Sequence, residues 1–280
     1  MTVDDGEGEM VTGMVSVTVV VAAGTMNIQS NPAGAEIYLD GSDTGNITPY
    51  VITNVEAGSH TVRLTCLHYK NREEAVMVTA GETTYINWAL AYAVAETVTI
   101  QPDPAIGKDA HVEEVIADGN LGTSDTVWVG EWAGGQVNRA YIQFDLSAIP
   151  ATAAVLDAKL SLYYYNSSAA QPVDIGVYKV TGSWDEGSIT WNFQPTCAPA
   201  PEYVLAMPAT VTDNFAAWDI DALVQGWIDG SIANYGVVFK DIDETTTKAG
   251  KGFYASDWTY GPRRPKLVIS YYDPTAPTGP

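Results

Sequence analysis

The sequence predicts an all-β protein, and three observations carry that prediction. Short apolar or alternating runs of strand length recur along the chain, while helical periodicity is nearly absent. Gly, Pro, Asn and Asp separate these runs and supply the residues that turns need. Aromatic residues make up 10% of the chain and form runs such as Leu162–Tyr165, which fit the pleated surface of a strand. We therefore expect sandwich or jelly-roll domains.

One short helix is expected at residues 219–229. Its sequence, DIDALVQGWID, begins with acidic residues, and its apolar residues recur at helical spacing. The residues on that apolar face are Ile220, Leu223, Val224 and Trp227. We expect this helix to be peripheral to the strands.

The chain length points to more than one domain. Two separate cores are the expectation for 280 residues. A short junction at 91–96 separates a compact set of strands from a longer series. We expect a leader at 1–24, a small β-sandwich at 25–93, a larger jelly-roll-like domain at 94–273 and a Pro-rich tail at 274–280.

The leader has the pattern of a single strand. It is acidic and contains Gly at first, and it then becomes largely apolar. A lone strand leaves its backbone groups unpaired, so it must join a sheet edge in its own chain or in another copy. The residues that would form this assembly strand are Met14, Val15, Val17, Val19 and Val21.

The charge of the chain limits its partners. Thirty-four acidic and thirteen basic residues give a formal charge of −21, which repels the phosphate backbone of a nucleic acid. No run approaches the roughly 20 apolar residues that a membrane-spanning helix needs. The only cysteines, Cys66 and Cys197, fall in different expected domains. A disulfide framework is therefore excluded, and one bridge or two free thiols remain open.

The smaller domain carries a recognisable order of motifs. The run NPAGAEIYLDG is followed by Gly45, Thr48-Pro49, a Gly-Ser-His turn and Tyr69. This order resembles the PEGA domain family, with the tetrapeptide Pro32-Ala33-Gly34-Ala35 in place of the usual one. The resemblance implies a small β-sandwich on a surface protein, with no chemistry of its own, that serves as a spacer or an adhesive module.

Most of the larger domain also resembles a known family. The segments are NRAYIQFDLSAIP, AVLDAKLSLYYY, VTGSWDEGSITWNFQP, and ANYGVVFKD with RRPKLVISYYD near the end. Together they resemble the DNRLRE family, which overlaps a carbohydrate-binding module family associated with acidic polysaccharides. The eponymous string is missing, and Arg139 stands in the corresponding strand region. The resemblance implies a jelly-roll-like domain on an exterior protein.

No pattern in the chain predicts catalysis. Asp185 and Glu186 are the best acid pair, but adjacent residues on a strand or tight turn point apart and cannot flank one glycosidic bond. The three histidines are scattered, and no nucleophile elbow, phosphate loop or HExxH motif occurs. We therefore expect a protein that is not an enzyme.

Sugar binding is the chemistry that the aromatic residues favour. Exposed aromatic rings give apolar platforms, and Arg or Lys would contact an acidic sugar. The strand alternation puts Tyr163 and Tyr165 on one face and Tyr164 on the other, and for any single ring a core position is the main alternative. The candidate platforms are Trp128, Trp132, Tyr164, Trp258 and Tyr260, and the candidate anion contacts are Arg139, Lys179, Arg263 and Arg264.

Two further kinds of site are open. Calcium is the most plausible cofactor, because Asp118, Asn120 and Asp125 lie in a Gly-rich loop and hard cations take oxygen ligands. Solvated acids are the alternative. Asn46 and Asn166 begin N-glycosylation sequons in turn-like contexts, which agrees with an exterior location.

Two functions follow from these patterns. In the first, the protein is an extracellular structural or adhesive subunit of a surface layer, matrix or filament, and its partners are copies of itself, joined head to tail by addition of the leader strand. In the second, it is a carbohydrate-binding module protein that anchors a polysaccharide, for which the family resemblance implies an acidic sugar.

Overall fold

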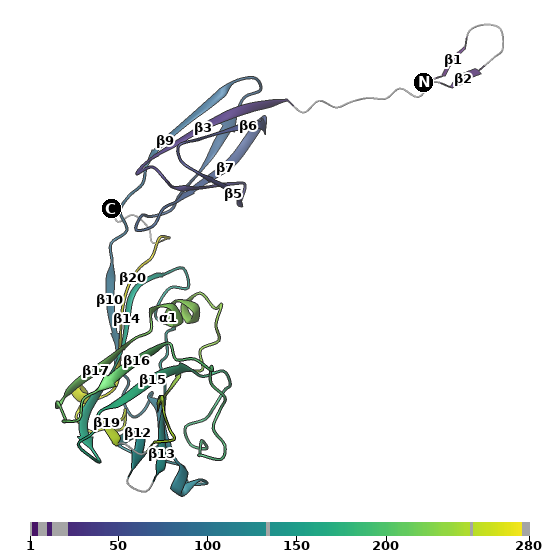
Figure 1. The fold of residues 1–280 in the computed structure, drawn as a ribbon. Coiled ribbons are helices and arrows are strands. Elements are labelled where there is room, and N and C mark those ends of the chain that lie inside the picture. The colour runs from purple at the N-terminus through teal and green to yellow at the C-terminus, as the bar shows by residue number, and fades with distance from the viewer. Residues whose placement is uncertain (1, 5–9, 13–21, 133–134, 247–248, 276–280) are drawn as a thin grey trace. The chain divides into compact units, whose positions relative to one another are not determined.

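The computed structural model describes residues 2–4, 10–12, 22–132, 135–246 and 249–275 (Figure 1). The chain divides into two compact units between Tyr92 and Ala93. Near the start of the chain, β1 (Thr2–Asp4) and β2 (Met10–Thr12) form a two-stranded antiparallel pair. The predicted assembly strand, which runs from Met14 to Val21, lies outside the described residues.

The first unit is a sandwich of a three-stranded and a four-stranded sheet. The three-stranded sheet has the order β6 (Tyr50–Glu56), β3 (Ala23–Asn31) and β9 (Thr83–Ala89), with β3 and β9 parallel. The four-stranded sheet has the order β5 (Ser42–Ile47), β4 (Glu36–Leu39), β7 (Gly58–Thr65) and β8 (Arg72–Val78). Alternate residues such as Met26, Ile28 and Ile86 point inward and form the core, as period-2 patterning requires.

The second unit contains one eleven-stranded sheet, coloured teal to yellow in Figure 1. Its main path is β10-β20-β14-β19-β12-β13-β18-β15-β16, while β11 pairs with β13 and β17 pairs with β14. The strands are β10 (Glu96–Ile100), β11 (Lys108–Glu113), β12 (Thr126–Trp132), β13 (Gln136–Gln143), β14 (Ala154–Ser167), β15 (Val173–Lys179), β16 (Tyr203–Met207), β17 (Asn214–Asp219), β18 (Val237–Asp241), β19 (Gly250–Tyr254) and β20 (Lys266–Tyr272).

The core of the second unit collects one face of nearly every strand. Leu160 and Leu162 of β14, Phe253 of β19 and Trp218 of β17 are fully buried in it. The indole Nε1 of Trp218 donates a hydrogen bond of 3.0 Å to the carbonyl of Ile175, which satisfies its polar atom inside the core.

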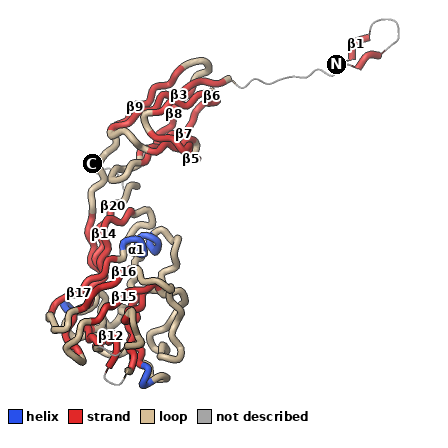
Figure 2. The backbone as a smooth tube through the Cα atoms, in the orientation of Figure 1, coloured by secondary structure: helices blue, strands red, loops and turns tan. Residues whose placement is uncertain are grey.

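The one α-helix among the described residues confirms the prediction from helical spacing. It is α1 (Asp221–Ile228), which is drawn in blue in Figure 2. Leu223, Val224 and Trp227 on its apolar face are buried. Two short 3-10 helices, Glu114–Ile116 and Gly261–Arg263, complete the described helical structure. No helix in the described part of the chain is long and apolar enough to cross a membrane.

The all-β prediction is confirmed, but several strands lacked a recognisable pattern. In the first unit the sequence of β5, SDTGNI, is polar apart from Ile47 and does not predict a strand. In the second unit β19 reads GKGFY, with two glycines that weaken a strand pattern. Cys66 and Cys197 are both free thiols.

Candidate functional site

The outer face of β14 begins the candidate site. Leu162 and Tyr164 point into the core, so Tyr163 and Tyr165 point to the opposite, outer face. A bulge between Tyr164 and Asn166, opposite β19, interrupts the regular register at this point. The expectation that Tyr164 is an exposed platform is therefore wrong, because its ring is fully buried against Phe253 at a centroid distance of 5.7 Å.

Two glycines of β19 make room for two tryptophans of β12. A Cβ atom added to Gly252 would lie 3.0 Å from the ring of Trp128, and one added to Gly250 would lie 2.8 Å from Nε1 of Trp132. The two indoles therefore lie directly over the β19 backbone, a close approach that only glycine permits. Their ring centroids are 4.8 Å apart.

Three rings from different segments form a parallel stack beside the tryptophans. Tyr165 lies 4.4 Å from Tyr254 with an interplanar angle of 12°, and Tyr254 lies 4.1 Å from Trp258 with an angle of 17°. Trp128 meets Tyr165 edge-on at 6.1 Å, which joins the stack to the tryptophan pair. Tyr254, the inner ring of the three, is held between the other two.

The other end of this aromatic face approaches basic side chains. Tyr163 lies 5.8 Å from Tyr254 and 5.2 Å from Phe215 of β17. The Arg263 guanidinium lies 4.7 Å from the centre of the Tyr163 ring, and the Lys266 amine lies 3.9 Å from that of Phe215. Both cations thus take part in cation–π contacts.

These rings form a continuous surface, which we call the aromatic strip. It crosses four neighbouring strands, β12, β19, β14 and β17. Tyr254 is nearly buried, Trp132 is 38% exposed, and the rest are half-buried. Next to the strip, Tyr260 is 58% exposed and lies 6.0 Å from Arg263. The members of the strip are Trp128, Trp132, Tyr163, Tyr165, Phe215, Tyr254 and Trp258.

The predicted anion contacts do not gather in one place. Arg139 points from β13 into a different cluster, where Nε donates to Glu244 at 2.7 Å and Nη1 to Gln194 at 3.0 Å. The Nε atom of Arg264 donates to the carbonyl of Trp258 at 2.8 Å. Lys179 lies at the end of β15, away from the strands of the aromatic strip. Only Arg263 contacts the strip through its guanidinium face.

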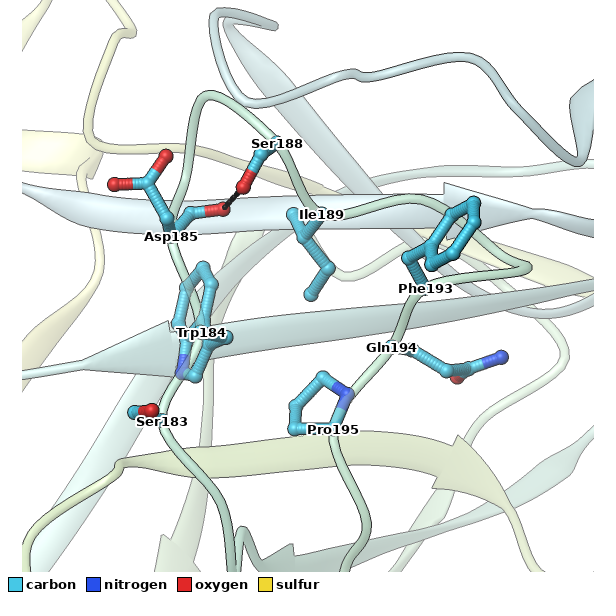
Figure 3. Close-up of a pocket in the computed structure, with 8 residues that line it drawn as sticks. All are labelled: Ser183, Trp184, Asp185, Ser188, Ile189, Phe193, Gln194 and Pro195. Atoms are coloured by element: carbon cyan, nitrogen blue, oxygen red, sulfur yellow. Dashed lines mark hydrogen bonds between the residues drawn. The ribbon is translucent and has the colours of Figure 1, made fainter.

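A pocket lies on another part of the same domain, within the loop after β15 (Figure 3). It has a volume of about 690 Å³, and Phe193 beside it is 76% exposed. Its polar groups are largely engaged, because Gln194 Oε1 accepts from Tyr141 and Asp185 Oδ1 accepts from the Gly187 N–H. The remaining lining residues are Ser183, Trp184, Ser188, Ile189 and Pro195.

The two carboxylates of the acid pair in this loop, Asp185 and Glu186, accept hydrogen bonds from different segments of the chain. Asp185 accepts from Gly187 within the turn, whereas Glu186 Oε1 accepts from the Asp109 N–H at 2.9 Å. Burial raises the pKa of Asp109 to about 7, and the nearby Glu186 and Asp257 carboxylates add to this effect. Glu186 therefore ties the loop to β11, and the two carboxylates serve different contacts.

Two of the predicted calcium ligands, Asp118 and Asn120, have protein partners in the structure. The Asn120 amide donates to the carbonyls of Glu186 and Ile189, and Asp118 accepts from Asn192. Among the described residues no three Asp, Glu, His or Cys side chains gather in a way that could hold a metal ion. Asn120 is better explained as the residue that holds the loop after β15.

The two sequons differ in exposure. Asn166 is exposed on the outer face beside Gly252, while Asn46 is half-buried and donates to the carbonyl of Thr44 at 3.0 Å. Thr48 of the first sequon is buried and accepts from the Ala35 N–H. Glycosylation at both positions stays a prediction.

Comparison with known proteins agrees with the chemistry of the aromatic strip. The model of carbohydrate-binding module family 96 matches residues 97–271. The chain belongs to this family. Residues 23–93 match the PEGA domain, so the predicted order of a PEGA domain followed by a carbohydrate-binding-module-like domain is confirmed. Both domains are of non-catalytic kinds that are typical of secreted or surface proteins, and no enzymatic family is indicated.

Solved structures offer weaker likenesses. The TIE protein of Bacillus anthracis is 12% identical, with 71% of this chain and 48% of that chain covered and a TM-score of 0.21. BcpA, the major pilin subunit of Bacillus cereus, is 13% identical, with 92% and 61% covered and a TM-score of 0.18. The VP2 subviral particle of infectious bursal disease virus is 12% identical, with 91% and 58% covered and a TM-score of 0.20. Such low TM-scores carry no argument, and this chain spans only about half to three fifths of those chains. No curated protein matches it.

Sequence reasoning found part of the strip and missed the rest. Trp128, Trp132 and Trp258 were expected and lie together, with Tyr260 beside them. Tyr254 and Phe215 were missed because they belong to β19 and β17, whose short sequences give no clear strand pattern. The signal that could have found Tyr254 is the run Gly250-Lys251-Gly252, in which alternate glycines mark one face of a strand.

Proposed function

We propose that this protein binds a polysaccharide outside the cell, through the aromatic strip of its family 96 domain. The observation that carries the proposal is the line of half-buried rings on the outer face of β12, β19, β14 and β17. Natural cores bury such rings, and a large exposed apolar patch on a soluble domain marks a binding surface. Membership of a carbohydrate-binding family supplies the ligand class.

The geometry of the strip suits a chain rather than a single sugar. Four neighbouring strands at a spacing of about 4.8 Å give a surface roughly 14 Å across. The exposed indole of Trp132 at one end and the exposed phenol of Tyr260 near the other provide apolar faces with polar atoms at their edges. Asn166 adds an exposed amide between them.

Affinity electrophoresis in gels that contain polysaccharide tests this proposal. Replacing Trp128 and Trp132 together by Ala removes the exposed end of the strip and should weaken binding at least about tenfold, or ~1.4 kcal/mol. The control is Phe193→Ala, which removes a more exposed ring from the pocket loop and should leave binding unchanged. Loss of binding in the control, with retention in the double variant, would assign the ligand to the pocket instead.

A second candidate function is the assembly of copies into a surface layer or filament by strand addition. Within the described residues, β6 and β9 pair on one side only, both with β3, so the three-stranded sheet of the PEGA domain has two open edges. Open edges accept additional strands. The leader 1–24 of a neighbouring copy is the proposed donor.

Deleting residues 1–24 tests the second candidate. If the leader joins copies, the full chain forms assemblies visible by negative stain, and the shortened chain is monomeric in sedimentation. Assemblies that persist after the deletion would exclude strand donation. A full chain that is monomeric at all concentrations would exclude assembly by the chain alone.

A further inference from the structure

The backbone that leads into β3 is held between two turns of the PEGA domain. The Ala22 carbonyl accepts from the Ala57 N–H at 2.8 Å, in the turn after β6. The Ala23 carbonyl accepts from the Gly81 N–H at 2.9 Å, in the turn before β9. Residues 22–23 therefore lie at the end of the three-stranded sheet, and a strand that precedes them starts beyond that end.

The assembly strand lacks the residues for a return to its own sheet. To lie beside β6 or β9 of the same copy, the chain would have to reverse direction between the strand and Ala22. Residues 14–22 read MVSVTVVVA and include no Gly, Pro, Asn or Asp, which are the residues that tight turns favour. Val and Thr also disfavour the positive φ of many such turns. The sequence therefore favours pairing with a second copy.

The two open edges of the PEGA sheet differ in regularity. β9 pairs with β3 through seven consecutive residues without a register shift. β6 has a bulge opposite Gly24 and Thr25, and its Asn54 has a φ of 59°. A bulge interrupts the row of backbone groups along an edge and blunts it against added strands. β9 is therefore the better acceptor.

The open backbone groups of β9 belong to its odd-numbered residues. The Leu90 N–H donates to the Asn31 carbonyl at 2.9 Å, so the even-numbered residues of this segment turn their backbone groups toward β3. Because these directions alternate along a strand, the N–H and C=O groups of Tyr85 and Asn87 face away from β3. In the described part of the chain no strand lies beside them.

A contact between the assembly strand and β9 brings no charges together. Residues 14–21 contain no charged side chain, and neither does β9, whose sequence is TTYINWA. Copies with a formal charge of −21 each repel one another, and two uncharged strands let their backbones approach without opposing acids. Valines on one face of the assembly strand would extend the core beside Ile86 and Trp88.

We propose that β9 is the edge that accepts the assembly strand of a neighbouring copy. This assignment rests on the second candidate function and names its acceptor. The added strand pairs with the open groups of Tyr85 and Asn87 and makes the three-stranded sheet four-stranded. It also gives the Tyr85 side chain, which is 76% exposed, a neighbour on the outer face of the sheet.

Proline substitutions at matched positions on the two edges test the assignment. Val51 of β6 and Tyr85 of β9 both lie opposite Asn27, and both side chains are exposed. The backbone groups of Asn27 face β9, so the N–H of Val51 faces away from β3, like that of Tyr85. Tyr85→Pro should raise the concentration at which the full chain assembles at least about tenfold, because it removes a donor from the acceptor edge. Val51→Pro should change it by less than about twofold. Sedimentation velocity and negative stain measure the assembly.

A second substitution and a second measurement support the comparison. Tyr85→Thr keeps the N–H and removes the ring, and it should assemble within about twofold of the unchanged chain. Loss of assembly in Tyr85→Thr would overturn the assignment, because the ring would then hold the partner. If Tyr85→Pro does not fold, hydrogen exchange on the full chain replaces it. The amides of Tyr85 and Asn87 should be protected in assemblies and exposed in the chain without residues 1–24, and protection of Val51 instead would assign β6.

The outcomes separate the choice of edge from strand donation itself. Assembly that is blocked by Val51→Pro would overturn the assignment to β9 and leave strand donation in place. Assembly that survives both prolines but is lost without residues 1–24 would place the acceptor outside the PEGA sheet and overturn the assignment too. Screening by salt should strengthen this contact, so assembly that weakens between about 50 and about 500 mM NaCl would show that ion pairs hold the copies instead. A full chain that never assembles would contradict the second candidate function.

Discussion

The larger domain has two aromatic outer faces, of which the loop after β15 covers one. On the face of β11, β13 and β18, the loop after β15 lays Trp184 and Trp191 over the sheet, and Tyr141 is only 2% exposed. On the face of β12, β19 and β14 lies the aromatic strip, whose rings are mostly half-buried and pack chiefly on one another. The difference teaches that aromatic richness alone does not mark a binding face; the loop decides which rings remain available.

Polar and cation–π contacts anchor the loop after β15 on the covered face. Tyr141 Oη donates to Gln194 at 2.8 Å, and the Arg139 guanidinium lies 4.7 Å from the centre of the Trp191 ring. Glu186 joins the loop to β11. These contacts fix the loop after β15 on the sheet, and we expect the two faces to respond differently to substitution.

The largest difference in the free energy of unfolding is expected between two alanine variants, each of which replaces a tyrosine on one of the two faces. Tyr141→Ala should lower the free energy of unfolding by about 5 kcal/mol, because it leaves a cavity under the loop and removes the bond to Gln194. Tyr165→Ala, on the half-buried strip, should cost only about 1–2 kcal/mol. Urea denaturation of both variants measures this. Equal losses would mean that the strip is part of the core.

The next largest effect is expected in the pH dependence of stability, through the buried carboxyl group of Asp109. The pKa of Asp109, raised to about 7 by burial, lies above its usual value of 3.8. The native state therefore holds a proton that the unfolded state releases, so stability is highest below about pH 4 and falls until about pH 7. The contribution is on the order of 4 kcal/mol, at about 1.4 kcal/mol per pKa unit.

Asp109→Asn should remove most of this decline, as measured by chemical denaturation between about pH 4 and about pH 7. The matched control is Asp145→Asn, at a carboxylate whose pKa is lowered by the hydrogen bonds from Ser147. Its contribution is lost as pH falls, so it should leave the decline in place. A decline that survives in Asp109→Asn would assign the proton to another group.

The ion pair under the loop should have a moderate effect. Arg139→Gln breaks the contact with Glu244 and the cation–π contact with Trp191, and the pair is about one quarter exposed, with side-chain exposures of 24% and 21%. We expect a loss of about 2 kcal/mol and faster proteolysis within residues 183–195. Unchanged proteolysis would show that the loop does not depend on Arg139.

The smallest effect is expected at the exposed ring of the loop. Phe193 is 76% exposed, so Phe193→Ser should change the free energy of unfolding by less than about 0.5 kcal/mol. Thermal unfolding checks this, and wild-type stability keeps the variant usable as a binding control. A marked loss would mean that Phe193 helps to hold the loop.

Local sequence patterns predict much of the fold. Alternation in β14 correctly separates Tyr163 and Tyr165 from Tyr164, and the helical spacing from Ile220 to Trp227 correctly places α1. Local patterns failed at β5, which is polar, and at β19, which contains two glycines. The calcium site expected at Asp118, Asn120 and Asp125 stays a prediction.

The sequence by itself determined which face of each strand carries rings, because side chains alternate along a strand whatever it pairs with. Only the tertiary structure decided which rings meet. Trp128, Tyr165 and Tyr254 are far apart in the chain and become neighbours because β12 and β14 both pair with β19. Such pairing depends on long-range contacts among all the strands, and a short segment does not encode its partner. The same pairing laid two indoles over glycines and left the aromatic strip half-exposed, where we propose that sugar binds.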